Sequence, residues 1–168
     1  MARAMPIGSE MASRQTGFTY MGVLMVMVIS GIAMAGAGLV WHQQMQRAKE
    51  QQLLFVGNEI RQAIRSYYQP DPNGQQQYPP SLNALLLDNR YPNVKRHLRR
   101  LYADPFSRPD TTGDAAWGLV KQQERIIGVY SVSKQTPLKK RGFPAIYELF
   151  EGAKMYQQWQ FVYVPGVD

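Results

Sequence analysis

One stretch of the chain, residues 18–41, contains no charged side chain and is mostly apolar. Its 24 residues would form a helix about 36 Å long, whereas the hydrocarbon core of a bilayer is about 30 Å thick. Glycine, alanine and serine recur within it, and such small residues let neighbouring helices approach closely. The stretch therefore predicts a transmembrane helix that also packs against partner helices. An ordinary secretory signal peptide, whose apolar region is shorter, is the less favoured interpretation.

The residues that follow continue the helical pattern. No proline occurs between His42 and Tyr68, and from Leu53 onward apolar residues recur at the spacing of one helix face. Proline, asparagine and glycine at 70–74 then provide a strong stop. The sequence predicts one helix from Phe18 to about Tyr68, with its first half facing lipid or partner helices and its second half packed on a head domain.

The rest of the chain predicts a small α+β head. Ser81 is a good N-cap for a short helix that ends near Asn89, and another short helix is expected from Ala145 to about Gln157. Three segments have the residues of strands: 117–120, 126–133 and 160–164. The expected fold is α+β, with a long N-terminal helix, transmembrane in its first half, packed on a small antiparallel β-sheet head.

Catalytic chemistry has little support in the sequence. The chain has no cysteine, which excludes disulfides, thiolate metal sites and a cysteine nucleophile. It lacks the GxSxG and HExxH motifs, and neither His42 nor His97 has a carboxylate partner at local spacing. Glu148 and Glu151 are better explained as a solvated helix face than as an acid–base pair. We therefore expect no enzyme activity, no catalytic residue and no cofactor.

The junction at which the uncharged stretch begins is the most specific motif. A basic leader of 17 residues ends in Gly17, and the apolar residues start at once with Phe18. This junction resembles the class III signal of type IV pilins and type II secretion pseudopilins. The resemblance implies that prepilin peptidase cleaves the bond between Gly17 and Phe18 and that Phe18 is then methylated. It divides the chain into a leader (1–17), a transmembrane and assembly half-helix (18–41) and a periplasmic head (42–168).

Motifs farther along extend the resemblance over roughly residues 10–133. They are Tyr78–Pro79, Leu98–Leu101, Asp104–Phe106 and Gly128–Ser133, in an order similar to that of the major pseudopilin head. The resemblance implies partners: other pilin or pseudopilin subunits, the assembly platform with its ATPase machinery, and the membrane.

Gly22 departs from the family pattern. It occupies the fifth position after the cleavage site, where most members carry a glutamate. That glutamate is thought to meet the charged N-terminus of the neighbouring subunit, since an unpaired charge in an apolar setting is costly. The assembly helix, which includes Phe18 and Gly22, lacks this glutamate. We therefore favour a minor or tip subunit of the filament over the bulk subunit.

Calcium binding is a second departure. Major pseudopilins bind calcium through an acidic C-terminal loop, whereas the segment 134–150 of this chain is basic where oxygen ligands would be needed. Asp104, Asp110 and Asp114 cluster, but turn chemistry explains them more simply. We expect no metal site.

A candidate basic patch remains in this chain of formal net charge +7. It consists of Lys95, Arg96, Arg99, Arg100, Lys139, Lys140 and Arg141. Such a patch, with Tyr91 and Tyr102 for base stacking, could bind nucleic acid, but a solvated face that contacts acidic groups is the favoured interpretation.

The sequence thus predicts a pilin-like structural subunit of a type II secretion pseudopilus or related type IV filament. The expected location is the bacterial inner membrane, crossed once, with the head in the periplasm and the chain assembled into a periplasmic or surface filament. Two alternatives stay open. One is a DNA- or adhesion-competent minor pilin, and the other is a bitopic, membrane-anchored periplasmic domain.

Overall fold

The computed structural model describes residues 18–107 and 117–166, except for the side chains of residues 18–19 and 33–40. The leader, including Gly17, lies outside the described residues, as does the side chain of Phe18. The chain divides into two compact units, Met1–His42 and Gln43–Asp168. The second unit is called the head below.

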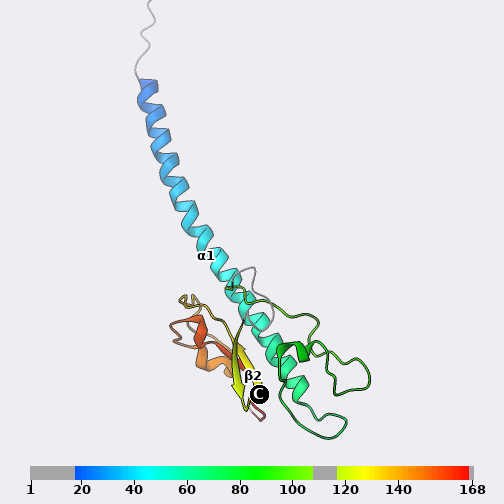
Figure 1. Ribbon diagram of the computed structural model, residues 1–168. Helices are drawn as coiled ribbons and strands as arrows, with labels where there is room; N and C mark the ends of the chain where they lie inside the picture. Colours follow the sequence, from blue (N-terminus) through cyan, green and yellow to red (C-terminus); the bar gives the residue numbers. More distant parts are fainter. Residues whose placement is uncertain (1–17, 108–116, 167–168) are drawn as a thin grey trace, which may run out of the picture. The chain divides into compact units, whose positions relative to one another are not determined.

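Helix α1 runs over Phe18–Tyr68 and has 51 residues (Figure 1). Its limits agree with those predicted from the uncharged stretch, the apolar spacing and the stop at Pro70. In the first unit, the described side chains from Tyr20 to Ile32 are all exposed. The second part of α1 belongs to the head and buries one face.

The prediction that α1 crosses a membrane is wrong. Within the described residues, no helix has an apolar stretch long enough for a membrane span. The same finding overturns the transmembrane half-helix at 18–41, the single-pass location in the inner membrane and the bitopic alternative.

The head contains a three-stranded antiparallel sheet in the order β1–β2–β3. Its strands are β1 (Gly118–Gln122), β2 (Arg125–Tyr130) and β3 (Gln160–Val162). Residues Gln123 and Glu124, which join β1 to β2, both have positive φ, as a tight hairpin turn requires. The α+β class and the antiparallel sheet therefore agree with the prediction.

The core lies between α1 and this sheet. Helix residues Leu53, Val56 and Ile60 are buried together with Phe161 of β3 and Trp159 just before it. Gly57 permits the close contact, because a Cβ atom there would overlap the ring of Phe161. Strand β2 contributes Ile126 and Val129 to the same core.

The short helices differ from the prediction. Only a 3-10 turn, η1 (Leu82–Leu85), forms after Ser81, and Ser81 makes no side-chain cap bond. Two 3-10 helices, η3 (Ala145–Phe150) and η4 (Tyr156–Gln158), replace the single helix expected from 145 to 157. They are separated at Gly152, which has a φ of 72° that a helix cannot contain.

Strands β2 and β3 end earlier than predicted, whereas β1 extends to Gln122, two residues beyond its predicted end. Strand β2 stops at Tyr130 rather than Ser133. The hydroxyl of Ser131 and the amide of Val132 donate instead to Asp104 Oδ2, at 2.7 and 3.3 Å. The Asp104 carboxylate thus binds the groups that a neighbouring strand would otherwise bind. This contact spans 27 positions and is not visible in the local sequence pattern.

Candidate functional site

The first candidate is the apolar surface of α1 in the first unit. Ten large apolar side chains there are 41–72% exposed: Tyr20, Met21, Val23, Leu24, Met25, Val26, Met27, Val28, Ile29 and Ile32. Soluble monomers rarely leave contiguous apolar surface uncovered on this scale. We call residues 20–32 the apolar segment. Its chemistry suits close packing against apolar groups of a partner.

The glycines of the apolar segment leave open space. A Cβ atom added at Gly22 or Gly31 would meet no described atom within 4 Å. Neither glycine is therefore required by contacts with the described part of the chain. Both leave backbone accessible to an approaching helix.

The second candidate is a polar cluster at the C-terminal end of α1. Asp88 is fully buried and binds Arg90 in bidentate fashion, with Nη2 and Nε at 2.7 and 2.9 Å from its carboxylate oxygens. Arg90 Nη2 also donates to the carbonyl of Tyr67, at 2.6 Å, and its guanidinium lies 3.7 Å from the Tyr67 ring centre. Arg90 thereby satisfies one of the terminal carbonyls that a helix leaves without partners.

His97 completes this cluster. Its Nδ1 lies 2.8 Å from the hydroxyl of Ser66, and its Nε2 lies 3.1 Å from Asp88 Oδ2. The contacts fit a neutral imidazole that donates from Nε2 and accepts the Ser66 hydroxyl at Nδ1. Burial lowers the pKa of His97, while the hydrogen bond to Asp88 opposes this shift.

Two opposing effects act on Asp88. Burial alone would raise the pKa of its carboxyl group, but hydrogen bonds from Arg90 and His97 outweigh burial and lower the pKa to about 2. Asp88 is thus ionised and accepts hydrogen bonds from the Arg90 guanidinium and the His97 imidazole. We interpret Ser66, His97 and Asp88 as a structural clamp, because Arg90 already neutralises the carboxylate that would otherwise polarise His97.

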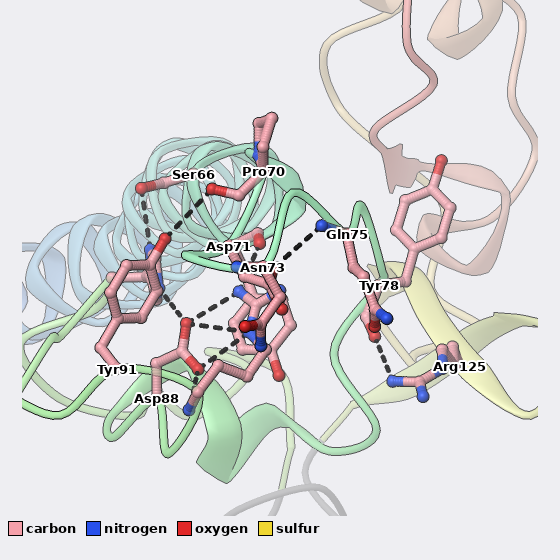
Figure 2. A network of polar contacts seen from close by, with 12 residues as sticks. Ser66, Pro70, Asp71, Asn73, Gln75, Tyr78, Asp88, Tyr91 and Arg125 are labelled. Atoms are coloured by element: carbon pink, nitrogen blue, oxygen red, sulfur yellow. Dashed lines mark hydrogen bonds and ion pairs between the residues drawn. The ribbon is translucent and has the colours of Figure 1, made fainter.

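Figure 2 shows the surroundings of the clamp. Asp88 and Tyr91 lie against the end of α1 that carries Ser66, and the Tyr91 hydroxyl donates to the carbonyl of Pro70 at 3.3 Å. Asp71 forms the turn after the helix by accepting the amides of Asn73 and Gln75. The sequence prediction missed Asp88 as the partner of His97. The two residues are nine positions apart, and only the tertiary fold brings their side chains together.

A third polar group lies where α1 enters the head. The Glu50 carboxylate is buried and accepts the amides of Leu138 and Lys139, at 3.1 and 2.7 Å. Tyr156 also donates to it, at 3.2 Å. Burial, assisted by the Glu50 charge, raises the pKa of Tyr156 to about 12, so its hydroxyl keeps its proton. These bonds attach the loop around residues 138–139 to the helix.

The residues of the candidate basic patch fall into two groups. Lys95, Arg96, Arg99 and Arg100 surround His97, which binds Ser66, whereas Lys139, Lys140 and Arg141 adjoin the loop bound by Glu50. Glu50 and Ser66 are 16 positions apart on α1, or about 24 Å. The segments that carry the two groups therefore contact α1 at points about 24 Å apart.

Several of these cations stack on aromatic rings. Lys95 Nζ lies 3.8 Å from the ring centre of Tyr91, and Arg100 lies 4.8 Å from that of Tyr102. Each of the two tyrosines thus has one of the chain's own cations against its ring.

The acidic residues that the structure describes show no metal geometry. Asp104 accepts the amide of Phe106 at 2.9 Å, the turn contact expected from the sequence, while Asp110 and Asp114 lie outside the described residues. Throughout the described ranges, no three acidic or histidine side chains gather as a metal site would require.

Comparison with known proteins adds no relative to these observations. No family model, curated protein or solved structure matches this chain.

Proposed function

We propose that this chain is a structural subunit of a pilin-like filament, either a type II secretion pseudopilus or a related type IV filament. The exposed apolar segment carries the proposal. Full burial of a valine, leucine, isoleucine or methionine side chain contributes about 1.5–3 kcal/mol, so the nine exposed ones here, with Tyr20, provide a strong driving force for association. The partner surface is the equivalent helix of neighbouring subunits.

The leader junction supports the same function from the sequence. Cleavage between Gly17 and Phe18 would place Phe18, the first residue of α1, at the new N-terminus. The proposed partners are prepilin peptidase, other pilin or pseudopilin subunits, and an assembly platform with its ATPase.

Processing is tested by the mass of the chain. The full-length protein is produced with and without a prepilin peptidase, and its intact mass and N-terminal residue are measured. A chain that begins at methylated Phe18 only when the peptidase is present supports the proposal. A chain that retains residues 1–17 in both cases removes its premise.

Assembly is tested by placing a charge on the apolar segment. Val26→Lys should reduce recovery of the chain in filaments at least tenfold, because burial of an unpaired charge is costly. Gln52→Lys is the matched control, since Gln52 is an exposed position of α1 within the head. Equal recovery of the two variants would contradict assembly through the apolar segment.

Gly22 leads us to propose a minor or tip position in the filament. Without a carboxylate at this position, one subunit offers no countercharge to the N-terminal amine of the next. Gly22→Glu should increase the number of copies incorporated per filament, measured by quantitative immunoblotting of sheared filaments. Unchanged incorporation would remove the basis for the tip assignment.

A further inference from the structure

A groove lies beside α1 at the start of the head. It has a volume of about 340 Å³ and is lined by Arg47, Glu50, Gln51, Leu54, Leu138 and Lys139. Leu54 and Leu138 supply apolar surface, and Arg47 and Lys139 supply positive charge. The Glu50 carboxylate is engaged by two backbone amides and Tyr156, so it contributes little free negative charge.

The groove is basic, whereas one exposed leucine of the head has acidic neighbours. Leu149 of η3 is 92% exposed, more than any other large apolar side chain described. The exposed carboxylates Glu148 and Glu151 flank it. We call these three residues the acidic knob.

The acidic knob is held in a fixed position. On one side of Leu149, the Tyr147 hydroxyl donates to Asn58 at 2.7 Å. On the other, Phe150 stacks on Trp159 with ring centres 5.4 Å apart. The Glu151 carboxylate accepts the amide of Gly142 at 2.9 Å. Because its neighbours are anchored, the backbone at Leu149 loses little conformational freedom when a partner covers the side chain.

We propose that the acidic knob of one copy docks in the groove of a second copy. Leu149 would lie against Leu54 and Leu138, and Glu148 would approach Arg47 and Lys139. A leucine side chain has four heavy atoms and at about 30 Å³ for each water-sized group needs about 120 Å³, which the groove provides. Charge complementarity sets the orientation of such a contact.

The two surfaces share no residue, so the proposed contact joins different surfaces of two copies. A contact between different surfaces repeats from copy to copy and builds an open array when it does not close into a ring. The inference rests on the proposed function, since it assigns the head a contact within the same filament. The contact itself can be measured whether or not the apolar segment assembles.

Cysteine cross-linking tests the contact without background, because the chain has no cysteine. Two differently tagged full-length copies are co-expressed, one with Leu149→Cys and the other with Leu138→Cys. Under mild oxidation, we expect a disulfide-linked dimer that carries both tags. The control replaces Leu138→Cys by Leu87→Cys, whose side chain has a similar exposure, 47% against 39%.

Charge exchange tests its orientation. Lys139→Glu in the copy with Leu138→Cys should lower the yield of mixed dimer about threefold, the effect of losing one exposed ion pair. Glu148→Lys in the other copy should restore the yield. Yields of mixed dimer equal to the Leu87→Cys control would overturn the inference, even if processing at Phe18 is normal. A mixed dimer from a chain that keeps its leader would support this contact while removing the proposed function.

Discussion

Gly57 shows how one residue sets the distance between helix and sheet. Its position in α1 faces the ring of Phe161, which packs at an edge-to-face angle on Tyr147 and Phe150. Glycine normally weakens a helix by about 1 kcal/mol relative to alanine. Here the missing side chain makes room for an aromatic core.

Replacement of Gly57 by alanine should therefore destabilise the head despite the better helix propensity. Phe161 is fully buried and cannot move aside, so overpacking should cost about 1–3 kcal/mol. The free energy of unfolding in urea measures the effect. Gln62→Ala, at an exposed position of the same helix, is the control and should change stability little. A Gly57→Ala variant as stable as the wild type would show that the core can expand.

Asp88 gives the head a predictable response to acid. Its pKa is about 2 in the folded chain and 3.8 when unperturbed. Because the folded value is the lower one, ionised Asp88 stabilises the head above about pH 4, and this contribution of about 2 kcal/mol is lost as the pH falls towards 2.

Comparison with Asp88→Asn isolates this effect from that of other acids. Asp104, whose pKa burial raises, contributes with the opposite sign, so total stability alone is ambiguous. The difference in unfolding free energy between wild type and Asp88→Asn should shrink by about 2 kcal/mol between pH 6 and pH 2. A difference that stays constant over this range would mean that Asp88 is not an ionised anchor.

At the scale of elements, the hairpin between β1 and β2 carries local strain. Gln123 and Glu124 have φ values of 49° and 61°, in the left-handed region that non-glycine residues adopt at a cost. The turn joins β1 to β2, and β2 contributes Ile126 and Val129 to the core. The sheet therefore holds the turn in a conformation that its own residues disfavour.

An Asn–Gly turn should stabilise the head. Gln123→Asn with Glu124→Gly matches the sequence preference of this turn and should raise the free energy of unfolding by about 1 kcal/mol. The change removes only an exposed ion pair between Lys121 and Glu124, at 3.5 Å. The melting temperature, followed by circular dichroism, measures the gain. A lower melting temperature would indicate that the Glu124 side chain stabilises the head by more than the left-handed backbone at residues 123 and 124 destabilises it.

At the scale of the molecule, the chain separates folding from association. The buried hydrophobic core extends from Leu53 to Tyr163 and lies entirely in the unit Gln43–Asp168. The apolar segment lies entirely in the other unit. The residues that form the core of the head are thus distinct from those of the apolar segment.

Removal of residues 1–42 should therefore leave a folded head. We expect residues 43–168 to unfold cooperatively and to associate much more weakly than the chain with the apolar segment. Thermal melts and size-exclusion chromatography measure these properties. Loss of cooperative unfolding in the shorter chain would mean that the first unit contributes to the stability of the head.

The sequence by itself determined the features that depend on neighbours along the chain. Apolar spacing and the stop at Pro70 located both ends of α1, and β-branched runs located the three strands. Only the tertiary structure decided which residues far apart in the sequence contact one another. Glu50 meets Leu138 across 88 positions and Ser66 meets His97 across 31, and these contacts also place the basic residues in two groups. Such pairings depend on how α1 packs against the loops and the sheet, which no local pattern encodes.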